Sequence, residues 1–278
     1  MKKIVCLILT LLSLVLAASG SLRLSTAHLK QGGFFYLVYP AEKKYTIHFP
    51  YAPKSLKPFL HQGKKVVFVP VHYSTPAGTY PLVVKENERE IFTAEITVGD
   101  GNFKKSYLTV TKQMAGKRSD ENLKAGSDKI GEAKKNSLVE KQWTGKFVNP
   151  AGIKSSNNFG AMRYVNKKVV GYHSGLDYSV GVGTPIKAAN AGKVIFAQKL
   201  VTTGNTLVID HGMNIFSSYS HLSAFAVKEG QIVKKGDLVG KSGATGFVTG
   251  PHLHFVISIG TIAVNPALFM EEAVLEGE

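Results

Sequence analysis

The segment GPHLHF places His252 and His254 one residue apart in an otherwise apolar stretch. Successive side chains of a β-strand point to opposite faces, so HLHFVISI would carry both imidazoles on one face and Leu253 and Phe255 on the other. Two same-face neighbours lie roughly 7 Å apart. A metal ion could therefore bind one imidazole directly and keep the other nearby as a catalytic group.

A second pair of candidate ligands, His173 and Asp177, lies upstream in GYHSGLDYS. In a straight strand these residues would be about 13 Å apart, too far for one ion whose ligand bonds are about 2 Å long. A helical turn, or a bend at Gly175, would bring them together. With His254 they would form a His₂Asp set with an open fourth position, which is typical of a catalytic zinc site.

Two further histidines, His211 and His221, precede the HLHFVISI segment in the sequence. IFSSYSHLS is predicted to place Ser217, Tyr219 and His221 on one strand face, with His221 as a second non-ligand imidazole beside the metal. His211 precedes a glycine, and we interpret it as structural. The only cysteine is Cys6, so no thiolate zinc site is expected. A His₂Asp set favours zinc over magnesium or calcium, which prefer oxygen ligands.

The elements that must position these residues are mostly strands. Residues 21–110 show β-branched alternation between Pro/Gly turns, which predicts a small β module of sandwich or barrel type. Residues 111–142 are polar, with glycines that weaken a single long helix, and are predicted to be a partly helical linker. Residues 143–278 are again strand-rich and predict a C-terminal antiparallel β-sheet catalytic domain. The predicted fold class is therefore mostly β.

Residues 1–20 have the charged start, short apolar run and small residues of a secretory signal peptide. The apolar run of about 14 residues is short for a membrane span, which takes about 20, so an uncleaved anchor is the less favoured alternative. We therefore expect export to the periplasm or cell envelope. The chain has 34 Lys and Arg against 19 Asp and Glu, a formal charge of +15. An exported basic protein suits an anionic surface, and no nucleic-acid partner is expected.

In their order along the chain, these motifs resemble the LytM/lysostaphin-type zinc peptidases of bacterial cell walls, of the kind found in Gram-negative bacteria. The similarity covers about residues 159–269 and includes HSGLDYS, GNTLVIDHG, SYSHLS and TGPHLHF. It implies that His173, Asp177 and His254 bind one zinc ion. It also implies that peptidoglycan is the substrate and that a D-alanyl–diaminopimelate cross-link is cut by a D,D-endopeptidase reaction.

The resemblance further assigns His221 and His252 as the paired catalytic histidines. We expect His252 to act as general base and His221 to hydrogen-bond the developing oxyanion, although the two roles are exchangeable. Three alternatives remain: carboxypeptidase trimming of stem peptides, a non-hydrolytic regulator or activator, and a pure wall-binding protein. A lipoyl- or biotin-carrier unit is disfavoured, because GQIVKKGDLVGKSG has no modifiable lysine at a hairpin tip.

The N-terminal module (residues 21–110) shows no catalytic constellation, which suggests a regulatory or substrate-positioning role. One hypothesis is that it packs over the zinc cleft and keeps the enzyme latent, with residues 111–142 as the hinge. A protein regulator is a further candidate partner, and the sequence leaves the oligomeric state open.

Overall fold

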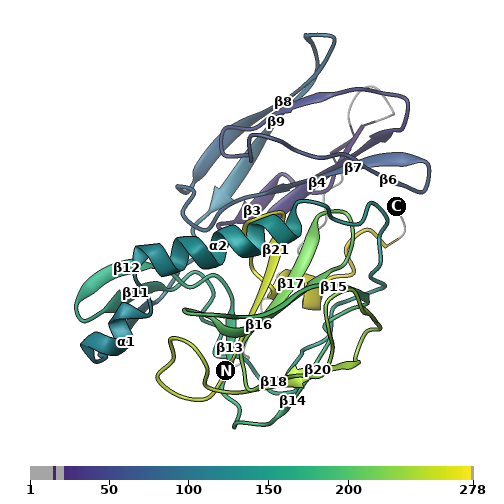
Figure 1. Ribbon diagram of the computed structural model, residues 1–278. Helices are drawn as coiled ribbons and strands as arrows, with labels where there is room; N and C mark the ends of the chain where they lie inside the picture. The colour runs from purple at the N-terminus through teal and green to yellow at the C-terminus, as the bar shows by residue number, and fades with distance from the viewer. Residues whose placement is uncertain (1–14, 17–21, 277–278) are drawn as a thin grey trace, which may run out of the picture.

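The computed structural model describes residues 15–16 and 22–276 (Figure 1). Almost all of the predicted signal peptide lies outside these described residues. The exception is β1 (Val15–Leu16), which pairs with β2 (Arg23–Leu24). Strands dominate the described chain, which confirms the predicted mostly-β fold class. Across the described ranges, no helix is long and apolar enough to cross a membrane.

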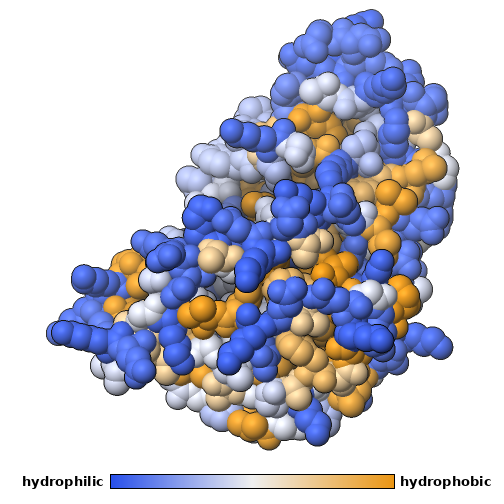
Figure 2. All heavy atoms as spheres, viewed as in Figure 1, coloured by the Kyte–Doolittle hydropathy of each residue, from blue (hydrophilic) through white to orange (hydrophobic). Residues whose placement is uncertain are grey.

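The N-terminal module is a sandwich of two β-sheets. The first sheet has the order β1-β2-β4-β7-β6 and includes β4 (Phe34–Pro40), β6 (Phe59–His61) and β7 (Lys64–Pro70). The second has the order β3-β9-β8-β5, made of β3 (His28–Lys30), β5 (Thr46–His48), β8 (Gly78–Glu86) and β9 (Arg89–Gly99). A buried apolar cluster fills the space between the sheets. The outer end of the module, at the top of Figure 2, is covered by hydrophilic residues.

The first sheet is buried on both of its faces. Phe35 belongs to the sandwich core, whereas its neighbour Phe34 points the other way and stacks on Phe269 of the C-terminal part, with ring centroids 5.0 Å apart. On β7, Phe68 likewise reaches the C-terminal part, where its ring centroid lies 6.5 Å from that of Trp143. A strand covered on both faces has no solvent side to carry polar residues. This explains why FFYLVYP and VVFVP are almost entirely apolar.

The C-terminal part, residues 143–276, is built on a seven-stranded antiparallel sheet of order β13-β21-β17-β16-β15-β19, with β22 paired to β21. Its strands are β13 (Leu176–Tyr178), β15 (Gly192–Leu200), β16 (Gly204–Asp210), β17 (Ile215–Leu222), β19 (Ile232–Val233), β21 (Leu253–Ile259) and β22 (Ile262–Val264). A smaller sheet, β14-β20-β18, contains β14 (Pro185–Lys187), β18 (Ala224–Phe225) and β20 (Leu238–Lys241). α3 (Ala267–Glu271) follows the last strand.

The predicted linker contains α1 (Lys112–Gly116) and α2 (Asp120–Lys134). Ser119 caps the N-terminus of α2, where its hydroxyl accepts a hydrogen bond from the Asn122 backbone N–H at 3.2 Å. Two acidic residues in the first turn interact favourably with the helix dipole. α2 crosses the molecule between the N-terminal module and the C-terminal sheet (Figure 1). Its residues Ile130 and Ala133 pack on the apolar cluster around Phe196. The segment expected to act as a hinge is therefore packed against the sheet.

One strand does not follow the boundary predicted at residue 110. β10 (Lys105–Leu108) was grouped with the N-terminal module, but it pairs in parallel with β11 (Met162–Val165). β11 in turn pairs with β12 (Lys168–Tyr172), which leads directly into His173. The sequence around residues 100–110 thus crosses to the C-terminal part before the linker begins. Local strand propensity predicts such a strand but does not say which partner it will pair with.

Candidate metal centre

Neighbouring strands and one close turn assemble the three predicted metal ligands. β13 and β21 are antiparallel, and Asp177 lies directly opposite His254 in their register. His173 comes from the segment between β12 and β13. Gly175 lets this segment lie against β21, because a Cβ at that position would clash with the carbonyl oxygen of Phe255. The chain therefore bends at the predicted glycine and His173 approaches Asp177.

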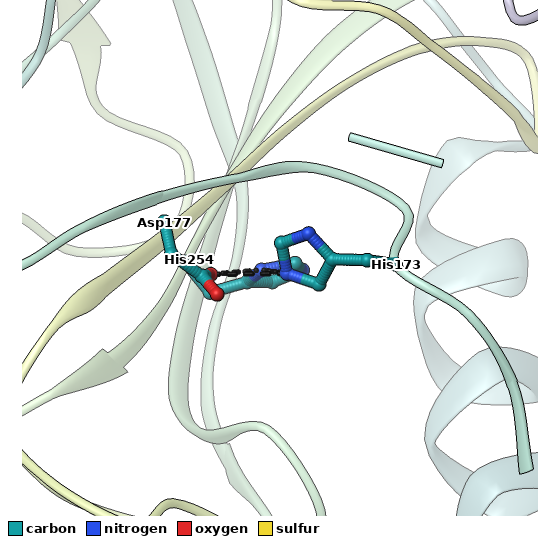
Figure 3. Close-up of side chains that lie close together, drawn as sticks. All are labelled: His173, Asp177 and His254. Atoms are coloured by element: carbon teal, nitrogen blue, oxygen red, sulfur yellow. Dashed lines mark hydrogen bonds and ion pairs between the residues drawn. The ribbon is translucent and has the colours of Figure 1, made fainter. Parts of the chain in front are cut away.

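Three side-chain atoms converge at one point (Figure 3). Asp177 Oδ1 lies 3.0 Å from His173 Nε2 and 2.9 Å from His254 Nδ1, and the two nitrogens are 3.0 Å apart. His173 is 2% exposed at its side chain, His254 13% and Asp177 18%, so the three side chains are largely buried but the cluster is not sealed from solvent.

The chemistry of this donor set fits one metal ion. A carboxylate oxygen only accepts and a neutral imidazole has one N–H, so the three mutual contacts of about 3 Å cannot all be hydrogen bonds. His173 Nδ1 faces the carbonyl oxygen of Asn158 at 3.0 Å and so carries the ring proton, which leaves an Nε2 lone pair facing the cluster. Donors about 3 Å apart suit a cation bound at about 2 Å from each, as zinc binds nitrogen and oxygen.

The protonation states also suit a metal. Burial by itself would raise the pKa of Asp177, but its short contacts with the imidazoles of His173 and His254 outweigh burial and hold the pKa well below its usual range. Burial lowers the pKa of His254 to about 4, against the opposing effect of the Asp177 carboxylate. Metal ligands must be deprotonated to bind. Asp177 and His254 are thus in their metal-binding forms at neutral pH.

Asn158 organises the ligands, and sequence reasoning missed it. Its side-chain amide donates to Asp177 Oδ2 at 2.9 Å, and its Oδ1 accepts from the Asp177 backbone N–H at 3.1 Å. Its carbonyl oxygen also accepts the hydrogen bond from His173 Nδ1. The stretch SSNNFG carries no periodic signal, because these contacts span 15 and 19 residues of sequence. Only the fold shows that Asn158 holds two of the ligands in place.

His221 reaches the cluster by a route that simple strand alternation does not predict. Tyr219 pairs with Phe255 and Ser220 with His254, so regular alternation would place His221 on the Tyr219 face, away from the ligands. The pairing of β16 with β17 shifts register here, and His221 has a φ of +65°. Such a bulge re-aims one side chain. The expectation that Ser217, Tyr219 and His221 share one face is therefore wrong.

As a result, His221 and His252 lie side by side next to the ligands. Their ring centroids are 4.8 Å apart, and His252 Nε2 is 3.8 Å from Asp177 Oδ1. Each ring faces a carbonyl oxygen with its Nδ1: His221 that of Thr245 at 2.8 Å, and His252 that of Gly250 at 2.9 Å. A carbonyl only accepts, so each Nδ1 carries a proton, and the neutral form of such a ring has its lone pair on Nε2. Burial, together with the charges of His254 and His252, lowers the pKa of His221 to about 3.

His211 lies in the core, apart from these residues. Its Nδ1 contacts the carbonyl oxygen of Ala191 at 2.7 Å and its Nε2 contacts Ser217 Oγ at 2.7 Å. The Ser217 hydroxyl continues the chain to the Tyr219 hydroxyl at 3.0 Å. Burial lowers the pKa of His211 to about 4. Both ring nitrogens have partners, as expected of a structural histidine.

Part of this sequence is similar to proteins of known activity. The peptidoglycan DD-endopeptidase ShyA of Vibrio cholerae serotype O1 is 40% identical over 112 residues, which cover 40% of this chain and 26% of ShyA. The DD-carboxypeptidase/endopeptidase Mpg of Neisseria meningitidis serogroup B is 40% identical over 94 residues, 34% of this chain and 22% of Mpg. The chain thus spans about a quarter of the length of these curated relatives.

A solved structure covers far more of the chain. A peptidase M23 protein from Pseudomonas aeruginosa aligns with 87% of this chain and 94% of its own, with a TM-score of 0.62 and 27% sequence identity. The model of peptidase family M23 matches residues 171–266. That range contains all five predicted site residues, His173, Asp177, His221, His252 and His254. The match to the family model, supported by the sequence identities and the shared fold, shows that residues 171–266 form a domain of peptidase family M23.

Proposed function

We propose that this chain is a zinc-dependent peptidoglycan hydrolase that cleaves peptide cross-links, with the D-alanyl–diaminopimelate bond as the expected target. The observation that carries the proposal is the convergence of His173 Nε2, Asp177 Oδ1 and His254 Nδ1 with two non-ligand imidazoles beside them. The printed names of ShyA and Mpg support the substrate class and the bond type.

The two non-ligand histidines supply proton transfer. Zinc, when bound, supplies Lewis acidity that polarises a peptide carbonyl and makes a water molecule acidic enough to lose a proton near neutral pH. We assign the general base to His252, whose Nε2 lone pair lies beside Asp177 and whose Nδ1–H is fixed by Gly250. The side chain of His252 is 21% exposed, so a water molecule and a substrate can reach it.

We assign His221 an acceptor role before proton transfer and the expected oxyanion-stabilising role after it. Hydrogen bonding to an oxyanion needs a proton on Nε2, but His221 carries its proton on Nδ1 and is neutral at pH 7. Its Nε2 therefore accepts a hydrogen bond, for example from the attacking water or from protonated His252. Once it has received a proton, the same Nε2 can donate to the developing oxyanion or to the leaving amine.

Charge and location complete the proposal. Peptidoglycan stem peptides carry free carboxylates, which a strongly basic chain attracts; its formal charge is +13 without Lys2 and Lys3 of the predicted signal peptide. We place the protein in the periplasm or cell envelope, on the support of the signal-peptide pattern in residues 1–20. Carboxypeptidase activity is the second candidate, because the name of Mpg includes both activities. The complete ligand and base set supports hydrolysis over a purely regulatory or wall-binding role.

Mass spectrometry of muropeptides tests this function. Purified cross-linked peptidoglycan is incubated with zinc-loaded Ser19–Glu278 and with its His254→Ala variant, after the zinc content of both has been measured. We expect one zinc per wild-type chain, loss of cross-linked dimers and a matching gain of monomers, with none of these for the variant. Shortening of monomers with intact dimers would instead identify a carboxypeptidase. Bound zinc with unchanged muropeptides would contradict hydrolysis.

A further inference from the structure

Arg163 of β11 is a largely buried cation beside the candidate metal centre, and its ion pair with Asp177 is a long one. Its side chain is 19% exposed, and its Nη2 lies 4.0 Å from Asp177 Oδ2, which is beyond hydrogen-bond distance. Its Nε is buried and has no hydrogen-bond partner among the residues that the structure describes. Asp177 does not satisfy it at this distance: its Oδ2 accepts a hydrogen bond from Asn158, and its Oδ1 lies against the imidazoles of His173 and His254.

A second guanidinium, that of Arg118, lies on the same side of β11 and β12. Gly171 is directly opposite Arg163 in the pairing of these strands. Since opposite residues of an antiparallel pair project to the same face, a side chain at Gly171 would lie next to Arg163. Arg118 takes that space: its Nη2 is 4.0 Å from where a Cβ of Gly171 would be and donates to Val170 O at 3.2 Å. The linker, between α1 and α2, thus delivers a second cation to the site.

The donors of Arg118 are also only partly used. Its guanidinium lies over the Phe247 ring, 5.9 Å from the centroid, in the loop that leads to His252. Its Nε is buried and, within residues 15–16 and 22–276, makes no hydrogen bond. Burial and the nearby charge of Arg163 both lower the pKa of Arg118. Two neighbouring cations with unused donors are unfavourable unless an anion joins them.

We propose that Arg118 and Arg163 form an anion subsite that binds a carboxylate of the peptide substrate next to the metal centre. The guanidinium fork matches the geometry of a carboxylate, and two such forks can bind both of its oxygens. This inference rests on the proposed peptide substrate. It gives the linker a role in substrate recognition, since Arg118 lies outside the residues matched by the family model, 171–266.

The test compares two synthetic tetrapeptides of stem-peptide sequence that contain diaminopimelate. One has free carboxylates on the diaminopimelate and at its C-terminus, and in the other these groups are amidated. Binding to zinc-loaded Ser19–Glu278 is measured by titration calorimetry. Arg118→Gln is the test variant, because a substitution of Arg163 would also change the surroundings of Asp177. Lys168→Gln, an exposed change of equal charge on β12, is the matched control.

We expect wild type and Lys168→Gln to bind the free-carboxylate peptide at least about tenfold more tightly than the amidated one. In Arg118→Gln this preference should fall about tenfold, because only the affinity for the free-carboxylate peptide is lost. The preference of Arg118→Lys should lie between those of wild type and Arg118→Gln. A carboxylate that binds only the metal would give the same preference in wild type and Arg118→Gln, which would overturn the proposal. Equal affinity of wild type for both peptides would also overturn it.

The outcome is separable from that of the proposed function. Binding with the expected preference but without cleavage of cross-linked peptidoglycan would leave the subsite standing and remove hydrolysis. Cleavage with no effect of amidation or of Arg118→Gln would remove the subsite and leave hydrolysis. The comparison of the two peptides on wild type needs no variant, so a poorly folded Arg118→Gln protein would not prevent a decision.

Discussion

The backbone conformation of His221 determines which face of the sheet its side chain occupies, and therefore whether the imidazole lies in the site. Its φ of +65° is unusual for a residue with a side chain, and it occurs where β17 slips register against β16. The strained torsion turns the imidazole from the core face to the face that carries His254. Strain of this kind persists where surrounding contacts fix it, and here the His221 N–H donates to Thr203 O at 2.9 Å.

Removal of the Asn158 side chain should loosen the metal centre. Asn158→Ala deletes the hydrogen bonds at both Asp177 Oδ2 and the Asp177 N–H, so we expect zinc affinity to fall by about tenfold to a hundredfold. Competition with a chromogenic chelator measures the affinity. Asn122→Ala, which removes an exposed hydrogen bond in the linker, serves as control and should leave affinity unchanged. Equal zinc affinity in Asn158→Ala and wild type would show that Asn158 does not position the ligands.

Buried His211 should make folding sensitive to acid. Its pKa is about 4 in the folded state and about 6.5 when unfolded, so between these values the unfolded chain binds more protons. Stability is therefore fully present above about pH 6.5 and falls as the pH drops towards 4. Between pH 7.5 and pH 5 the wild type should lose about 2 kcal/mol more than His211→Gln. Urea unfolding at both pH values measures the difference, and exposed His28→Gln should follow the wild type.

At the scale of elements, α2 carries an unusual buried cation into the C-terminal part. Lys134 is 8% exposed, its Nζ donates to Ser258 Oγ at 2.8 Å, and the ammonium lies 5.2 Å from the centre of the Phe216 ring. Burial lowers the pKa of Lys134 to about 8. The contact holds the C-terminal end of α2 on β21, the strand that carries His254. It also removes the ammonium from water, which is unfavourable for the charged form.

Replacement of this lysine by an apolar residue should stabilise the fold. At pH 7 the lowered pKa corresponds to about 3 kcal/mol, and loss of one hydrogen bond offsets about 1 kcal/mol, so Lys134→Met should be about 2 kcal/mol more stable. The unfolded lysine keeps its proton to about pH 10.5, so wild-type stability should rise between pH 8 and 10.5 and close the gap. Urea unfolding at pH 7 and pH 10 measures this, with exposed Lys129→Met as control. A variant less stable than wild type at pH 7 would contradict the argument.

At the scale of the whole molecule, a sheet buried on both faces joins the N-terminal module to the C-terminal part. Phe34 stacks on Phe269, and Phe68 lies against Trp143, so apolar contacts run from one core to the other. β10 adds backbone pairing across the same junction, and the linker contributes Arg118 at the edge of the site. The two parts are therefore expected to unfold together.

Phe68→Ala tests this coupling. The substitution leaves a cavity between Phe34, Tyr36 and Trp143, and we expect a loss of about 3–5 kcal/mol. Trp143 is the only tryptophan, so its fluorescence reports on the junction while circular dichroism reports on all strands. Both signals should shift together in one transition. Leu60→Ala, at a residue 63% exposed, should change stability by less than about 0.5 kcal/mol. A fluorescence transition that separates from the dichroism transition would show independent units.

The sequence by itself predicted the mostly-β class, which the structure confirms, and the candidate ligand set, whose three side chains the structure brings together. Strand alternation puts His252 and His254 on one face, and a glycine bend closes the spacing between His173 and Asp177. Only the tertiary structure decided which face of the sheet His221 occupies, because one bulge reverses the strand alternation there. It also decided the positions of Asn158, Arg118 and β10. These depend on contacts between segments far apart in the chain, whose pairing is fixed by the packing of the whole molecule rather than by any local pattern.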